Sequence, residues 1–372
     1  MPIVATNITL DPTEGMDKIT TTEKVTSPYF SDGSTELLGS SVVSSSLSAD
    51  NQKYFFGISK TGAATTEEFN VAFGSTSGFG HNVETNTKSE SEAIYKHFSS
   101  MLLESTEVTG GFFISRNNSL TTAPTEASIT TGKDVNIFIL TSRRTNHKDR
   151  LNKGNWTIAL SGSSTTIAEA SGKFVELTDD SVNDTPVSTP AGDRYNIVSG
   201  ALGTIAKAAS VKTFGFYYPD AGVMVFSQQE LSSSIPGNDD TVSEKVQFGS
   251  ASYAGFATAE TTNLDSDQAV RFINCLTGSD AKLSFRDEED QISAQYFCRV
   301  RSGHCNFSNN PTFVSGSLNE LRHAKMRGNT QTFITSVQLY NAAGDMVAVG
   351  NLSSPLKKNF SSEATIKVKL TY

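Results

Sequence analysis

The chain has 372 residues, of which 37% are hydrophobic and only 19% are charged. Its formal net charge of −9 argues against a general attraction to nucleic acid or to an anionic membrane. The 23 Phe and 10 Tyr supply apolar area for folded cores, which argues against disorder, and the length favours two or three domains. No apolar run approaches the roughly 18 residues of a membrane span, and the first residues do not resemble a secretory signal.

The N-terminal third predicts strands and one helix. Residues 1–27 are polar and rich in Thr, and we expect an extended arm there. Short apolar runs predict strands at residues 54–58, 69–73, 111–115 and 135–140. A helix is predicted over residues 88–104, where one set of apolar side chains recurs at helical spacing: Ala93, Ile94, Phe98, Met101 and Leu102.

The middle of the chain alternates short apolar runs with Gly, Asp and Pro. These runs predict the strands of a small β subdomain at residues 156–160, 174–177, 195–198, 214–218 and 223–226. A polar stretch at residues 227–250 predicts a linker or long loop, and residues 265–276 predict a second helix. Strands are predicted again at residues 282–285 and 292–300.

The C-terminal forty residues predict a β-hairpin followed by a final strand. Residues 332–340 and 346–349 flank a turn in which Gly344 can take the positive φ that a short loop requires. Strict alternation would place Phe333, Thr335, Val337 and Leu339 on one face of the first strand. The last strand, residues 364–370, alternates Ile, Val and Leu with Thr and Lys.

Together these patterns predict a mainly β protein with a few helices (α+β), built of antiparallel sheets and β-sandwich-like subdomains. We expect four segments: an N-terminal arm (1–27), a β/α domain (28–150), a small β subdomain (151–240) and a C-terminal β-rich domain (241–372).

Three cysteines and a neighbouring histidine are the nearest approach to a metal site. The spacing of Cys275, Cys298, His304 and Cys305 does not give the two ligand pairs of a zinc site, and an odd number of cysteines argues against a disulfide framework. Cys275 and Cys298 lie in apolar patterns, where a free Cys behaves as a small hydrophobe.

Two clusters of charge invite a functional interpretation. The acidic run Asp287–Asp290 is expected to be a solvated turn, because adjacent carboxylates do not face one another across a cleft as glycoside hydrolysis requires. The basic run Arg143, Arg144, Lys148 and Arg150 lacks interleaved aromatic residues; we expect a solvated face, with an ion-pair patch between subunits as the second possibility. Asp265 and Asp267 lack the other ligands of a calcium loop and are expected to cap a helix.

Catalytic motifs are absent from the sequence. The string Gly74-Ser75-Thr76-Ser77-Gly78 has Thr where a nucleophile elbow has Ser, and no phosphate-binding loop is present. The five histidines are scattered, and the aromatic residues Phe112, Phe113, Tyr217 and Tyr218 lie in strand-like runs that favour the core over an exposed binding face. We therefore assign no catalytic, cofactor-binding or metal-binding residue and no cofactor.

Several strings in a fixed order resemble virion structural proteins of contractile-tailed phages, especially those that infect marine cyanobacteria. The resemblance covers most of residues 140–372, and a faint further match is residues 54–60. Its strings are KDRL (148–151), GNWTIAL (154–160), LTDDS (177–181), RYNIVSG (194–200), YPDAGV (218–223), NFSNNPTF (306–313), residues 334–341, SPLKK (354–358) and IKVKL (366–370).

This resemblance implies a non-enzymatic component of the phage tail, at or near the baseplate, that is assembled in the host cytoplasm and contacts other virion proteins. It also implies several copies in a symmetric assembly, with no nucleic acid or membrane partner. The alternatives are a receptor- or carbohydrate-binding protein, or a neck- or capsid-associated protein, on the surface of the virion. A polysaccharide depolymerase is a further, weaker alternative, because no carboxylate pair is discernible.

Overall fold

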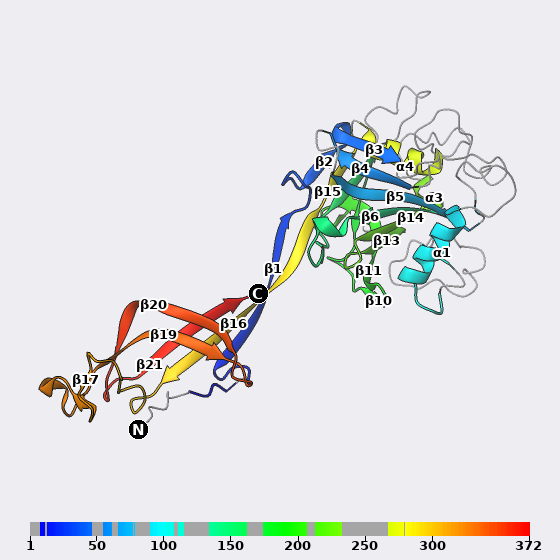
Figure 1. The fold of residues 1–372 in the computed structure, drawn as a ribbon. Helices are drawn as coiled ribbons and strands as arrows, with labels where there is room; N and C mark the ends of the chain where they lie inside the picture. The colour runs from blue at the N-terminus through cyan, green and yellow to red at the C-terminus, as the bar shows by residue number, and fades with distance from the viewer. Residues whose placement is uncertain are drawn as a thin grey trace. The chain divides into compact units, whose positions relative to one another are not determined.

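Figure 1 shows a computed structural model of the protein. The structure describes residues 8–11, 13–46, 55–61, 66–76, 78, 90–107, 111–114, 134–161, 174–206, 213–232, 267–278 and 280–372. The chain forms two compact units, which we call the larger unit (Val25–Glu289) and the smaller unit (Met1–Lys24 with Asp290–Tyr372). The chain passes from one unit to the other within two strands, β1 (Lys18–Pro28) and β16 (Arg286–Val300). This division differs from the four segments expected from the sequence.

The larger unit is built on one antiparallel sheet. Its strands, in spatial order, are β2 (Glu36–Leu38), β15 (Lys282–Ser284), β8 (Thr157–Ser161), β9 (Phe174–Asp179), β11 (Gly192–Ala201), β13 (Thr213–Tyr218), β14 (Val223–Ser227), β6 (Asn136–Ser142), β5 (Glu67–Ser75), β4 (Phe55–Lys60) and β3 (Val42–Ser46), with β10 (Val187–Thr189) and β12 (Thr204–Ile205) paired to β11. The mainly β class with few helices is therefore confirmed.

The central strands of this sheet are buried on both faces. Along β6, Phe138 and Leu140 belong to one apolar cluster, whereas Ile137 and Ile139 belong to a second. Successive side chains of a strand point to opposite faces of the sheet, and here every residue of the run is apolar, so both faces are apolar. The sheet therefore has a core on each side, and each core requires a cover.

Helices pack on both cores. The structure describes α1 (Glu90–Leu102), α3 (Gln228–Ser232) and α4 (Asp267–Thr277), besides the short 3₁₀ helices η1 (Gly39–Ser41), η2 (Arg144–Asn146) and η4 (Ala324–Met326). Phe272 of α4 stacks on Phe138 with ring centroids 5.0 Å apart, in the first cluster. Tyr95 of α1 packs in the second cluster. Both predicted helices are present, and residues 88–89 and 265–266 of the expected ranges lie outside the described residues.

The buried face of α1 is rotated from the predicted one. Ala93 and Met101 are exposed, whereas Tyr95 and Leu102 are buried. The cause is a close approach of the helix to β5 at Gly74, where an added Cβ would lie 3.1 Å from the Tyr95 Cα. Small or polar residues of α1 fit against such a surface, and the apolar pattern alone did not reveal this.

One predicted strand is absent. Residues 111–114 form no strand although Phe112 and Ile114 are buried. Their backbone N–H groups donate to side chains instead: Phe112 to the Tyr95 hydroxyl at 3.0 Å and Ile114 to Asp134 Oδ2 at 2.8 Å. The expected linker at residues 227–250 is wrong in its described part, which is the end of β14 (Ser227) followed by helix α3 (Gln228–Ser232). Its later part lies outside the described residues, as do Asp265 and Ser266.

The smaller unit consists of long strands. Residues 293–300 of β16 pair antiparallel with β21 (Ala364–Thr371), from Ser293 opposite Thr371 to Val300 opposite Ala364, and β1 neighbours β16 in this sheet. The expected arm thus contributes a strand. A separate two-stranded sheet joins β19 (Thr332–Tyr340) to β20 (Met346–Lys358), and β17 (Val314–Ser315) pairs with β18 (Glu320–Leu321).

The predicted C-terminal hairpin is present, and its second strand is longer than expected. Gly344 has φ +91°, and Asn341 N–H donates to the Asp345 carbonyl at 3.0 Å, which closes the turn. Exposure alternates from Thr332 to Thr335 and again, in the opposite phase, from Ser336 to Tyr340, because the register shifts between Ile334 and Ser336. Phe333 is consequently exposed, and it does not share the partly buried side of Val337 and Leu339.

Candidate functional site

The acidic and basic runs form one ion-pair cluster within the larger unit. Residues 287–289 are part of strand β16, and β7 (Arg150–Leu151) pairs with it so that Glu288 lies opposite Arg150. The Arg150 Nε lies 3.0 Å from Glu288 Oε1, and Lys148 forms an ion pair with Glu289. The expectation that residues 287–290 form a solvated turn is therefore wrong.

Burial decides what this cluster can do. Asp287 and Glu288 are buried, and their oxygens are occupied by hydrogen bonds and ion pairs from the same chain. Asp287 accepts from the Lys148 N–H at 2.9 Å and from the Ser27 hydroxyl at 3.2 Å, and Asn152 donates to Glu288. These carboxylates fix the segment around β7. All four basic residues have partners in their own chain: besides Lys148 and Arg150, Arg143 lies 3.9 Å from Glu67 and Arg144 donates to the Asp149 carbonyl at 3.2 Å. Arg143, Arg144 and Lys148 are exposed, and Arg150 is partly buried.

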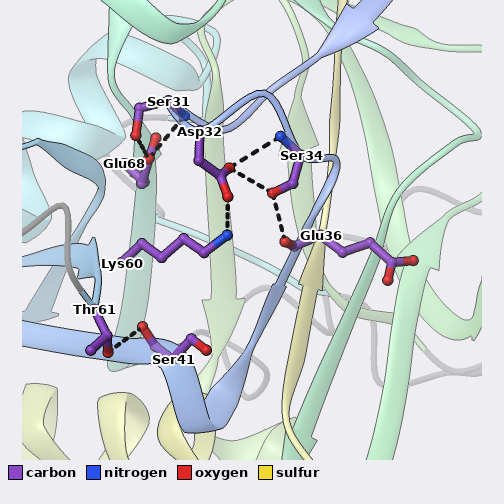
Figure 2. Close-up of polar contacts among 8 residues, drawn as sticks. All are labelled: Ser31, Asp32, Ser34, Glu36, Ser41, Lys60, Thr61 and Glu68. Carbon is purple, nitrogen blue, oxygen red and sulfur yellow. Dashed lines mark hydrogen bonds and ion pairs between the residues drawn. The ribbon is translucent and has the colours of Figure 1, made fainter.

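A second polar cluster fixes the turn that follows β1, as Figure 2 shows. Asp32 accepts from the Ser34 N–H at 3.1 Å and from the Ser34 hydroxyl at 2.7 Å, and Lys60 of β4 forms an ion pair with its other oxygen. The hydrogen bond from Lys60, followed by those from Ser34, lowers the pKa of Asp32 to about 2. The carboxylate thus serves as a fixed acceptor in a turn.

Glu68 of β5 lies beside this turn and is fully buried. It accepts from the Ser31 N–H at 3.0 Å and from the Ser31 hydroxyl, and from Asn146 Nδ2 at 2.6 Å. Figure 2 shows Ser31 reaching Glu68 from the turn. A buried carboxylate needs such donors, and here they tie three segments of the chain together.

Ser142 and His147 are the described residues that come closest to a nucleophile and a base. The Ser142 hydroxyl lies 3.0 Å from His147 Nδ1 and 2.5 Å from the Tyr29 hydroxyl. Burial, followed by the charge of Arg144, lowers the pKa of His147. The other ring nitrogen, Nε2, faces the backbone at Gly222, where an added Cβ would lie 3.2 Å away. The pair therefore holds the loop that follows β6 against the sheet.

Asp179 and Asp180 are adjacent buried carboxyls with raised pKa values. Burial raises both, that of Asp180 to about 6. Raised acids can indicate catalysis, but the oxygens here are engaged. Asp179 accepts the Gly154 N–H on both oxygens at 2.9 Å, and Asp180 accepts from the Asn196 N–H at 2.9 Å and Nδ2 at 2.8 Å. The pair holds the loop before β8 and strand β11 together.

The cysteines do not come together. Cys275 and Cys298 are buried and Cys305 is partly exposed, and all three are free thiols. Burial raises the pKa of Cys275, as expected for a small hydrophobic side chain in a core. In the part of the chain that the structure describes, no group of His, Cys, Asp and Glu has the arrangement of a metal site. Phe112, Tyr217 and Tyr218 are buried as predicted, and Phe113 is partly buried.

The smaller unit exposes apolar side chains that a folded protein normally covers. Both large apolar clusters lie within the larger unit. The smaller unit buries few apolar residues, while its exposed large ones include Met16, Ile19, Phe307, Leu318, Phe333, Tyr340, Met346, Val347, Val349, Leu356, Phe360 and Tyr372. Val347 on β20 is 62% exposed and Phe333 on β19 is 58% exposed. Contiguous exposed apolar area indicates a contact surface.

We call the β19–β20 pair with its turn the exposed hairpin (residues 332–358). Its base is fixed by Lys358, whose side chain is fully buried and donates to the Ser302 carbonyl at 2.9 Å, to Asn306 Oδ1 at 3.0 Å and to the Asn359 carbonyl at 2.8 Å. The Thr332 hydroxyl donates to the Cys305 carbonyl at 2.5 Å. The exposed hairpin is therefore presented from a polar anchor. No signal in the sequence marked Lys358, since a Lys in a polar string is ordinarily solvated.

Comparison with protein-family models, curated proteins and solved structures finds no match to this chain. Among the described residues, no helix has the length and apolar character needed to span a membrane.

Proposed function

We propose that this chain is a non-enzymatic structural protein of a contractile-tailed phage, placed in the tail at or near the baseplate. In this proposal the smaller unit makes fixed contacts with other virion proteins, and the larger unit is a self-sufficient folded body. The protein works by binding its neighbours in the particle.

One observation carries the proposal: the smaller unit exposes an apolar strand surface, and its described residues form no large apolar cluster. Phe333, Met346, Val347 and Val349 of the exposed hairpin are each more than half exposed. Burying apolar area releases roughly 25 cal/mol per Å², so a protein that leaves these side chains in water gains from a partner that covers them. Subunit surfaces in assemblies have this composition.

The polar clusters of the larger unit support the same view. The buried carboxylates Glu68, Asp179 and Glu288 are each engaged by donors or cations from neighbouring segments, and each joins two or more of these segments. This is the arrangement of residues that stabilise a fold. The resemblance to virion proteins adds its own support, since four of its strings (306–313, 334–341, 354–358 and 366–370) lie in the smaller unit.

The proposal is tested on purified particles. An antibody against this chain should label intact or disrupted virions in negative-stain micrographs, and labelling should concentrate at the tail end. Absence of label from both kinds of particle contradicts the proposed function, and label confined to the capsid or neck contradicts the tail placement.

A pair of variants tests the surface itself. Val349→Asp places a charge on the exposed hairpin and should lower incorporation of the protein into particles. Val182→Asp is the matched control, because Val182 is also an exposed valine, 65% accessible, but lies in the larger unit. Equal incorporation of the two variants would show that the hairpin surface is not a contact with the virion.

A receptor- or carbohydrate-binding role is the second candidate. It is favoured by exposed aromatic rings in the smaller unit, at Phe307, Phe333, Tyr340 and Phe360, because sugars stack on such rings. A glycan array distinguishes the two candidates: specific retention that is lost in Tyr340→Ala would favour the binding role over the structural one.

A further inference from the structure

Among the described residues, no strand pairs with the outer edge of β19. β19 forms its ladder with β20 alone, and none of the described backbone hydrogen bonds outside that ladder involves residues 333–340. A row of free N–H and C=O groups along a strand is a template for pairing with another strand. Proteins that do not use such an edge ordinarily protect it.

The other edges in the smaller unit carry protective features. β21 has Lys367 and Lys369. β20 contains Pro355, which has no N–H to donate. Pro355 lies in a bulge, in which four residues of β20 (352–355) are opposite the single residue Thr335 of β19. β1 carries Lys18, Glu23 and Lys24. Charges, prolines and bulges are the usual means of blocking an edge.

β19 has none of these protections. Its nine residues, Thr-Phe-Ile-Thr-Ser-Val-Gln-Leu-Tyr, include no charge, no Pro and no Gly. The whole stretch from residue 332 to residue 356 has one charged side chain, Asp345, which lies in the turn. A partner of opposite charge would therefore find little to recognise along this strand, whereas an identical strand would meet no like charge.

We propose that a second copy of this chain pairs with β19, antiparallel and about a two-fold axis at Gln338, so that the two hairpins form one continuous four-stranded sheet. The proposal rests on the contact role proposed for the smaller unit and names the partner at one of its edges. Two-fold contacts of this kind are self-complementary and closed, so they give a dimer and not a fibre.

The axis is placed at Gln338 because this residue is the midpoint of the regularly alternating segment from Ser336 to Tyr340. In this register Val337 of one copy lies opposite Leu339 of the other, both on the partly buried side. Tyr340 lies opposite Ser336 on the exposed side, and Gln338 lies opposite its own copy. Directly opposed side chains in antiparallel strands have Cβ atoms about 4.5–5.5 Å apart, which brings the two Gln338 side chains into contact.

Charge exchange at Gln338 tests the proposal by sedimentation velocity of the purified full chain. The wild type should sediment as a dimer. Gln338→Lys and Gln338→Glu should each associate at least about five-fold more weakly, since like charges then lie directly opposite one another. An equimolar mixture of the two variants should restore the dimer as a heterodimer. Neither a folding defect nor a merely structural role of Gln338 predicts this recovery.

Asn351→Lys is the matched control. Asn351 lies opposite Ser336 on β20 and is exposed, but it is one strand away from the proposed edge; this variant should remain dimeric. A monomeric wild type, unaltered association of both Gln338 variants, or failure of the mixture to recover would overturn the pairing. Dissociation by Asn351→Lys alone would also overturn it, because the hairpins would then meet face to face.

These outcomes are separate from those of the proposed function. If the protein is a monomer in solution but is found in virion tails, the strand pairing is contradicted and the structural role is supported. If the protein is a dimer that dissociates on charge insertion but is absent from particles, the strand pairing is supported and the structural role is contradicted.

Discussion

The buried ammonium of Lys358 gives the sharpest test of how the exposed hairpin is held. Lys358→Met keeps the length of the side chain and removes its charge and its three donors. The three acceptors that lose a partner are the Ser302 and Asn359 carbonyls and Asn306 Oδ1. Of these bonds, only the one to Asn306 lies in a fully buried environment; the other two are partly buried.

The magnitude follows from this difference in burial. Water can replace Lys358 as the donor to the two partly buried carbonyls, so the free energy lost at each is only a fraction of that of a hydrogen bond. Asn306 Oδ1 is left as an orphaned buried acceptor, which costs about 1–3 kcal/mol. Removal of the buried charge recovers part of its desolvation cost. We therefore expect Lys358→Met to destabilise the hairpin anchor by about 2 kcal/mol.

Hydrogen exchange read by mass spectrometry measures this loss locally. Amides at the base of the hairpin, around residues 302–306 and 356–359, should exchange roughly 30-fold faster in Lys358→Met, since each 1.4 kcal/mol is a factor of ten. The control is Lys357→Met, because Lys357 is the neighbouring residue and is exposed; its exchange should stay within a factor of about two.

Equal exchange in the two Lys variants would refute this reasoning, because it would mean that the ammonium contributes no more than a solvated one. Slower exchange in Lys358→Met would refute it more strongly. In that case the cost of burying the charge exceeds the value of its three hydrogen bonds.

Three further predictions concern the larger unit. Asp180 has a raised folded-state pKa, so its stabilising effect is complete below pH 3.8 and is lost as the pH rises through about 6. Between these pH values the free energy of unfolding should fall by about 3 kcal/mol in the wild type, and Asp180→Asn should abolish this fall in urea unfolding. A free energy of unfolding with the same pH dependence in the variant would contradict the raised pKa of Asp180. Lys60→Met should return the pKa of Asp32 from about 2 toward 3.8 in an NMR titration; a pKa that stays low would make Ser34 the main cause. Trp156→Ala should cost about 3–5 kcal/mol, since the fully buried indole stacks on Phe285 with centroids 5.5 Å apart, and a cost below that of a surface substitution would be inconsistent with this packing.

Local pattern predicted β13 and β14 because the information for these strands is local, whereas it missed β1 and predicted a strand at residues 111–115 where residues 111–114 form none. β13 and β14 are runs of apolar and aromatic residues bounded by turns, and their burial on both faces agrees with that composition. The C-terminal hairpin was predictable for the same reason, since Gly344 marks its turn. Its bulges were not predictable, because they depend on how β20 pairs and not on its composition.

The polar clusters were not predictable, because they join residues far apart in the chain. Lys148 and Asp287 are separated by 139 positions and meet only because β7 pairs with β16. In the sequence the basic run (143–150) and the acidic run (287–290) each resemble a solvated patch. Only the pairing of β7 with β16 shows that the charges of the two runs neutralise one another. The fold of the larger unit thus accounts for charges that composition alone would assign to the surface.

Charge is divided unequally between the two units, and this division separates two kinds of contact. The smaller unit has 11 Lys and Arg against 8 Asp and Glu, a net charge of +3, whereas the larger unit has 19 against 31, a net charge of −12. The whole-chain value of −9 is the sum of these two and describes neither unit. Within the smaller unit, Lys367 and Lys369 of β21 would bind an acidic partner in a salt-sensitive manner. The strand β19 carries no charge, so a dimer that forms through β19 should persist at high ionic strength. Dissociation of the dimer at high salt would indicate that the contact is made by β21.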